Sequence, residues 1–205
     1  MLERFRDAWA RILTPIARAL TKRGVSPDVV TLVGTLGVLV GALACFPRGW
    51  LGQGVVVITV FVFSDMVDGQ MAKLSGTASR WGAFLDSSLD RLADGAVFGG
   101  ILLYFVTQRD SAGWASVALA VLVLGQLTSY VKARAESLRF TVTGGLAARA
   151  DRLVVILLGA LLAGLGVSYA LEGAVALLAV AGLVTVGQRI GQVRRQALLE
   201  DVRPA

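Results

Sequence analysis

Four aspartates are the residues of this chain best suited to chemistry, because they lie within or beside long apolar runs. Asp65 and Asp68 are three residues apart, and Asp86 and Asp90 are four apart in the next run. On helices, each pair shares one face. The connection between the two runs is short, which makes the helices antiparallel neighbours. We therefore expect the four carboxylates to converge near one end of a helical bundle.

Converging carboxylates repel one another in a low dielectric unless a cation lies among them. Oxygen ligands favour a hard divalent ion, Mg²⁺ or Mn²⁺, and four carboxylates suffice for two ions. A metal pair suits phosphoryl or phosphatidyl transfer, because the attacking and leaving oxygens both need charge stabilisation. Gly69 and Gly82 flank the aspartates, where phosphates would approach the backbone closely. The pattern predicts a two-metal site for a phosphorylated substrate.

Two other interpretations of the aspartates stay open. The carboxylates could be structural partners of Lys73, Arg80 and Arg91, although these bases are few for four buried acids. They could also relay protons in a transporter, although the chain shows no inverted repeat of the kind that many transporters contain.

The amino-acid composition indicates a membrane environment and excludes several kinds of catalytic site. The chain has 205 residues, of which 56% are hydrophobic and 17% charged, with one cysteine and no histidine. A water-soluble domain averages about 25% charged residues, so a bilayer is the expected solvent. The lack of histidine excludes a Ser-His-Asp triad, and a single cysteine excludes an intrachain disulfide. The net charge of +6 fits membrane topology and anionic lipid better than nucleic acid.

Apolar runs of membrane-spanning length fill most of the chain. A span takes about 20 apolar residues. The runs predict an all-α polytopic membrane protein with six transmembrane helices, at residues 29–46, 51–69, 82–106, 112–130, 153–169 and 174–188. With both termini in the cytoplasm, Arg48 and Arg109 are the only basic residues of the outer loops. The positive-inside rule therefore orients the chain this way.

An N-terminal amphipathic interfacial helix is predicted to precede the spans. Within residues 1–23, apolar side chains recur at three- and four-residue steps, with basic residues mostly between them. A helix packed against its own protein would show the same pattern. The expected organisation is a juxtamembrane helix at 1–23, a transmembrane domain at 24–195 and a cytoplasmic tail at 196–205.

The spacing of the acids resembles a family signature. Written out, the segment is Asp65-x2-Asp68-Gly69-x2-Ala72-Lys73-x8-Gly82-x3-Asp86-x3-Asp90. It resembles the motif of the CDP-alcohol phosphatidyltransferase family, which has six transmembrane helices, except that the family usually has Arg in place of Lys73. Lysine keeps the charge but loses the bidentate fork.

The resemblance implies a role for each residue of the motif. Asp65, Asp68 and Asp86 would ligate the metals. Asp90 would both ligate a metal and act as the base on the acceptor hydroxyl. Gly69 and Lys73 would border the pyrophosphate of CDP. The reaction would be attack of an alcohol on the phosphorus that bears diacylglycerol, with CMP leaving.

Further segments are similar to an actinobacterial subgroup of the family, which transfers the phosphatidyl group of CDP-diacylglycerol to inositol phosphate. These segments are 14–18, 26–31, 129–136 and 149–153. The likeness implies a homodimer in the cell membrane with a cytoplasmic active site. It also implies that the CDP-diacylglycerol site is lined by Asp28, Val29, Val30, Thr31, Gly69, Lys73, Ser79 and Gly82. Asp28 follows Pro27 and could cap the first span, either instead of lining this site or in addition to it.

Basic residues at the cytoplasmic ends of the last three spans could bind the phosphate of an anionic acceptor. They are Lys132, Arg134, Arg149, Arg152 and Arg189. Ordinary positive-inside residues would look the same. Charge does not separate inositol phosphate from glycerol 3-phosphate, so phosphatidylglycerophosphate synthesis stays an alternative. The expected substrates are CDP-diacylglycerol and inositol phosphate, with two Mg²⁺, or Mn²⁺, per site.

Overall fold

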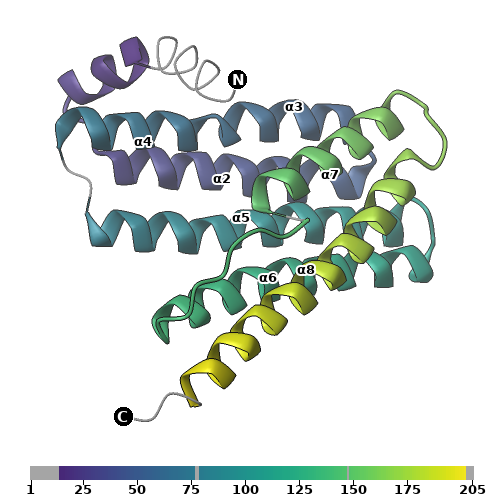
Figure 1. Cartoon of the computed structure of the whole chain (residues 1–205). Helices are drawn as coiled ribbons and strands as arrows, with labels where there is room; N and C mark the ends of the chain where they lie inside the picture. Colours follow the sequence, from purple (N-terminus) through teal and green to yellow (C-terminus); the bar gives the residue numbers. More distant parts are fainter. Residues whose placement is uncertain (1–13, 77–78, 147, 202–205) are drawn as a thin grey trace. The chain divides into compact units, whose positions relative to one another are not determined.

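The computed structural model describes residues 14–76, 79–146 and 148–201, and within these ranges the chain is helical with no strand (Figure 1). The elements are α2 (Pro27–Cys45), η1 (Phe46–Arg48), α3 (Leu51–Val62), α4 (Ser64–Ser75), α5 (Arg80–Thr107), α6 (Ala112–Ser137), α7 (Arg149–Gly164) and α8 (Ala170–Asp201). The all-helical prediction is therefore confirmed for the described residues.

The helix boundaries follow from local chemistry. α2 begins with Pro27, whose missing N–H costs nothing in a first turn. Ser26 Oγ accepts the backbone N–H of Val29 at 3.4 Å, so Ser26 caps this helix. The alternative in which Asp28 is the cap is wrong. α4 ends before Gly76, whose φ of +64° glycine adopts without strain.

Four helical stretches are long and apolar enough to cross a bilayer, namely Pro27–Arg48, Leu51–Met71, Ala112–Ser137 and Ala170–Leu199. They correspond to the first, second, fourth and sixth predicted spans. α5 has 28 residues but carries several charges in its first half. α7 has 16 residues, about 24 Å of helix. The predicted fifth span extends too far, because α7 ends at Gly164 and Gly166 adopts a φ of +90°. The count of six spans stays a prediction.

The chain divides into two compact units, and the first comprises residues 1–45 and 53–97. In this unit α2 packs against α3 and α4 through glycines. A Cβ at Gly34 would lie 2.9 Å from Ser64 Cβ, and one at Gly37 would overlap the ring of Phe61. Small residues permit such close approach between membrane helices. The glycines thereby let α2 lie directly beside the helix that carries Asp68.

The described part of the N-terminal segment is helical over residues 14–22. Ala17 is fully buried in a cluster with Val67 and Met71 of α4, and Leu20 packs against this cluster. Ile16 is 48% exposed. This stretch therefore has one face on the protein and another open to its surroundings. Residues 1–13 of the predicted interfacial helix lie outside the described residues.

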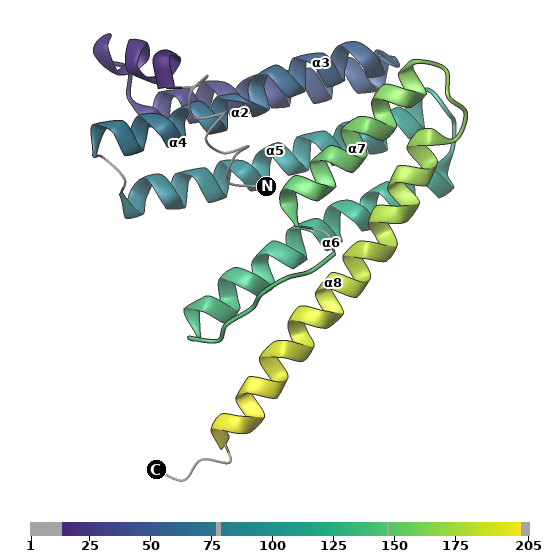
Figure 2. The ribbon, with the colours of Figure 1, turned by 45° about the horizontal axis from the view of Figure 1, so that its top comes forward.

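The second unit comprises residues 46–52 and 98–205. Its α6 and α7 both pack along α8, as two views of the ribbon show (Figures 1 and 2). Gly159 of α7 brings the two backbones close, since a Cβ there would lie 2.5 Å from Ala174 Cβ. Arg109 Nη2 lies 2.9 Å from Glu172 Oε1 and ties the α5–α6 connection to the start of α8. This packing positions the basic residues predicted to bind the acceptor.

Candidate active site

The predicted site residues divide between the two units. The four aspartates and all the residues predicted to line the CDP-diacylglycerol site belong to the first unit. The five basic residues predicted to bind the acceptor belong to the second unit. Each of these two groups of residues is therefore positioned by the helices of its own unit.

Asp68 is the most buried of the predicted metal ligands whose side chains are described. It lies on α4 and is 8% exposed. The hydroxyl of Thr31 on α2 lies 2.5 Å from Asp68 Oδ2 and 3.1 Å from the carbonyl oxygen of Pro27. One hydroxyl has one proton, and a carboxylate is the stronger acceptor. Thr31 therefore donates to Asp68 and fixes the orientation of its carboxylate.

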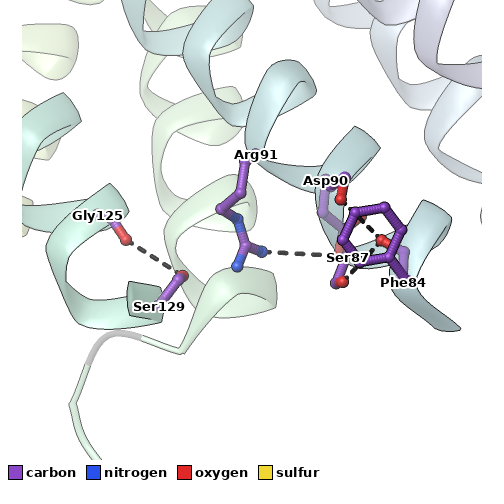
Figure 3. A network of polar contacts seen from close by, with 7 residues as sticks. Phe84, Ser87, Asp90, Arg91, Gly125 and Ser129 are labelled. Atoms are coloured by element: carbon purple, nitrogen blue, oxygen red, sulfur yellow. Dashed lines mark hydrogen bonds and ion pairs between the residues drawn. The ribbon is translucent and has the colours of Figure 1, made fainter. Parts of the chain in front are cut away.

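Asp86 and Asp90 lie one turn apart on α5. Asp86 is exposed. The side chain of Asp90 is 18% exposed and lies 3.7 Å from Arg91 Nη2 (Figure 3). Both carboxylates are within electrostatic range of Asp68. α4 and α5 thus bring three of the predicted ligands into one region of the first unit.

The donor chemistry of this region suits a hard divalent ion, because the groups are carboxylate oxygens. Among the described side chains, no ion pair joins Asp68 or Asp86 to a basic residue. Structural ion pairing therefore accounts for Asp90 at most. The described acids do not by themselves form a group that could hold a metal ion. Asp65 lies one turn before Asp68 on α4, and its side chain is outside the described residues.

The start of α2 carries four residues of the predicted nucleotide site. Asp28 accepts a hydrogen bond from Trp81 Nε1 at 3.1 Å. Val29 is 48% exposed, whereas Val30 packs against the cluster around Ala17. The side chain of Val30 is therefore partly buried and less accessible to a ligand than that of Val29. The fourth residue, Thr31, is engaged with Asp68.

The other predicted nucleotide residues lie on α4 (Gly69 and Lys73), in the connection that follows it (Ser79) and in the first turn of α5 (Gly82). Ser79 Oγ accepts the backbone N–H of Gly82 at 3.0 Å, so it caps α5. No described atom lies within 4 Å of the position that a Cβ on Gly69 would take. The surface beside Gly69 is therefore open to a ligand. The side chain of Lys73 lies outside the described residues.

Three of the basic residues in the second unit are accessible. Lys132 is exposed, with Nζ 3.8 Å from Glu136 Oε1 one turn along α6. Arg134 is exposed, and its Nη1 lies 3.4 Å from Ser137 Oγ. Arg149 is half-buried at the start of α7. Exposed pairs of this kind contribute about 0–1 kcal/mol, so Lys132 and Arg134 can turn toward a ligand at little cost.

Arg152 and Arg189 differ from the others because they are 2% and 8% exposed. Arg152 of α7 packs on Gly125, where a Cβ would lie 3.3 Å from Arg152 Nε. Arg189 of α8 donates from Nη1 to the carbonyl of Thr128 at 2.7 Å. Two buried guanidinium groups thus lie over adjacent turns of α6. Like charges buried together are unfavourable unless an anion joins them, so this arrangement has the electrostatics of an anion site.

Two residues of interest were missed by the sequence analysis. Asp94 is 3% exposed and lies one turn beyond Asp90 on α5. Its spacing of four residues from Asp90 was an available signal. The hydrogen bond from Trp81 to Asp28 could not be predicted in this way, because no periodicity indicates a contact between side chains so far apart in the sequence.

Comparisons with known proteins decide the family. A family model described as CDP-alcohol phosphatidyltransferase matches residues 24–187. The chain belongs to this family. It is therefore an enzyme of phospholipid biosynthesis and a membrane protein.

Individual relatives match nearly the whole chain. The phosphatidylinositol phosphate synthase of Cutibacterium acnes is 48% identical over 203 residues, covering 95% of this chain and 98% of that protein. The synthase of the same name from Streptomyces avermitilis is 48% identical and covers 100% of this chain and 87% of that protein.

Solved structures show the same similarity in three dimensions. The phosphatidylinositol phosphate synthase of Mycobacterium tuberculosis with CDP-DAG bound has a TM-score of 0.87 and 42% identity, covering 90% of this chain and 94% of that one. The same synthase in complex with manganese and citrate has a TM-score of 0.86 and 41% identity, covering 88% of each chain. The described helices therefore have the fold of these synthases.

Proposed function

We propose that this enzyme transfers the phosphatidyl group of CDP-diacylglycerol to inositol phosphate, giving phosphatidylinositol phosphate and CMP. The observation that carries the proposal is the 48% identity with phosphatidylinositol phosphate synthases over 95% of the chain or more. Two buried arginines over α6 support an anionic acceptor, because a neutral alcohol would not need them.

The divalent metals would be two Mg²⁺ ions, or Mn²⁺, held by Asp65, Asp68, Asp86 and Asp90. Support comes from the oxygen-only donors, from the electrostatic effect of Asp86 and Asp90 on Asp68, and from the manganese complex of the mycobacterial synthase. When bound, the ions would stabilise charge on the attacking and leaving oxygens. Asp68 would be held in place for this task by the hydroxyl of Thr31.

Asp90 would act as the general base. The acceptor hydroxyl would attack the phosphorus that bears diacylglycerol, the bond from that phosphorus to CMP would break, and the hydroxyl proton would pass to Asp90. The side chain of Asp90 is 18% exposed and pairs with Arg91, so it is accessible yet restrained. We expect Asp90→Asn to abolish turnover while Mn²⁺ binding persists; turnover near that of the unmodified enzyme would refute the assignment.

CDP-diacylglycerol would lie along the start of α2, the part of α4 that carries Gly69 and Lys73, and the start of α5. The open surface beside Gly69 supports this placement, as does the CDP-DAG complex of the mycobacterial synthase. Asp28 would be held by Trp81 Nε1. Val29, which is more exposed than Val30, would present its side chain to the ligand.

Inositol phosphate would be bound by the basic residues of the second unit. Arg152 and Arg189 would hold the phosphate, and Lys132, Arg134 and Arg149 would complete the pocket from the accessible side. Arg189 Nε is buried and has no hydrogen-bond partner within the described part of the chain. That donor supports a missing anionic ligand.

The proposal places the enzyme in the cell membrane, with both termini and the active site cytoplasmic, as a homodimer in contact with membrane lipids. The catalytic transmembrane domain would run from 24 to 195, after a juxtamembrane helix at 1–23 and before a cytoplasmic tail at 196–205. The excess of basic residues over the predicted inner loops supports this orientation.

The test is CMP release by the purified protein in detergent or vesicles, given CDP-diacylglycerol, Mg²⁺ and inositol phosphate. We expect CMP in proportion to phosphatidylinositol phosphate, and none when the metal is removed with a chelator. CMP release with glycerol 3-phosphate but none with inositol phosphate would overturn the proposal in favour of phosphatidylglycerophosphate synthesis.

A further inference from the structure

The segment between α6 and α7 is held on α8 by two glutamine side chains. Gln196 Oε1 accepts the backbone N–H of Thr141 at 2.9 Å, and Gln196 Nε2 donates to the Thr141 carbonyl at 2.7 Å. Gln192 repeats this pattern with Thr143, at 3.1 and 3.0 Å. Each amide thus pairs with the main chain of one residue as a neighbouring strand would. All four residues belong to the second unit.

The spacing of residues in a helix and in an extended chain explains why the two glutamines pair with these two threonines. Residues four apart on a helix are separated by about 6 Å along its axis. Residues two apart in an extended chain are separated by about 6.6 Å. Gln192 and Gln196 therefore present their amides at the spacing of Thr141 and Thr143. A shift of the segment by one residue would break all four hydrogen bonds.

The same face of α8 continues the contact toward the predicted acceptor residues. Arg189 Nη2 donates to the carbonyl of Gly144 at 3.2 Å. Thr185 Oγ1 accepts the N–H of Leu146 at 3.1 Å. Gly145, with a φ of +123°, lies so close that a Cβ there would be 2.6 Å from Thr185 Cγ2. The segment therefore follows α8 from residue 196 back to residue 185.

We propose that Gln192 and Gln196 are positioning residues for acceptor binding. By clamping the segment onto α8, they fix the Gly144 carbonyl that orients Arg189 and the chain that leads into Arg149 and Arg152. The inference rests on the proposed function, because it assumes that these arginines bind the acceptor phosphate. The aspartates and the predicted nucleotide residues belong to the first unit, whereas both glutamines belong to the second.

The test replaces both amides with an apolar chain of similar length, in Gln192→Met/Gln196→Met. We expect the KM for inositol phosphate to rise about tenfold, with kcat and the KM for CDP-diacylglycerol unchanged. Gln188→Met is the matched control, since Gln188 is exposed on the same helix and makes no hydrogen bond with the described residues. Gln196→Glu keeps an acceptor for the Thr141 N–H, so its KM for inositol phosphate should rise less than that of Gln196→Met.

Amide hydrogen exchange at Thr141 and Thr143 gives a readout that does not depend on turnover. We expect faster exchange in the double variant and no change in Gln188→Met. Faster exchange with an unchanged KM for inositol phosphate would overturn the positioning role. So would a parallel fall in kcat, in affinity for both substrates and in melting temperature, since that would indicate a purely structural clamp. Failure of the proposed function would appear separately, as unmodified enzyme that does not use inositol phosphate.

Discussion

Thr31→Val tests how the protein prepares Asp68 for a metal. Valine keeps the shape of threonine but removes the hydroxyl that lies 2.5 Å from Asp68 Oδ2. Both side chains are buried, at 7% and 8% exposure, so water cannot replace the lost donor. A hydrogen bond to a charged group contributes about 1.5–3 kcal/mol. Each 1.4 kcal/mol corresponds to about a tenfold change in binding.

We therefore expect Thr31→Val to weaken Mn²⁺ binding by about 10–100-fold, the usual range for a residue that orients a metal ligand. Binding should be measured directly, by the loss of the free Mn²⁺ paramagnetic signal on titration, and compared with the Mn²⁺ dependence of CMP release. Thr31→Ser retains the hydroxyl and should bind Mn²⁺ within about threefold of the unmodified enzyme. Unchanged or tighter Mn²⁺ binding by Thr31→Val would refute the reasoning, because it would show that Thr31 merely satisfies a buried carboxylate.

Two further predictions concern stability. Gly37→Ala should lower the free energy of unfolding by about 1–3 kcal/mol in a thermal unfolding assay in detergent, because its Cβ would overlap the ring of Phe61. Gly99→Ala is the control: a Cβ at Gly99 would have no described atom within 4 Å, so this variant should be neutral or slightly stabilising. Arg109→Ala should cost about 1–3 kcal/mol, because the carboxylate of Glu172 is 7% exposed and would lose its partner at 2.9 Å. Arg109→Ala/Glu172→Gln should recover part of that loss. If the losses of unfolding free energy in the two single variants simply added in the double variant, the two side chains would not be coupled.

The helical architecture and the shared helix of each aspartate pair could be predicted, because both depend on the spacing of residues along the chain. Apolar runs of about 20 residues have few alternatives to a membrane helix. Asp86 and Asp90 must share a helix face whatever surrounds them. The buried Asp94 follows the same rule, and extending the pattern by one turn would have found it.

Other features depend on packing between distant segments and leave no local pattern. The choice of Ser26 over Asp28 as the cap of α2 depends on where the first turn begins. The C-terminal end of α7 depends on the backbone at Gly166, and apolar composition alone placed it too late. The pairing of Gln192 and Gln196 with an irregular segment exists only because that segment lies along α8.

The central claim is that the acceptor is inositol phosphate, and a competition experiment tests it most directly. The enzyme would receive CDP-diacylglycerol, Mg²⁺ and equal concentrations of inositol phosphate and glycerol 3-phosphate, and the two lipid products would be quantified by mass spectrometry. Their ratio equals the ratio of kcat/KM for the two acceptors. We expect phosphatidylinositol phosphate in at least about hundredfold excess. A predominance of phosphatidylglycerophosphate would contradict it.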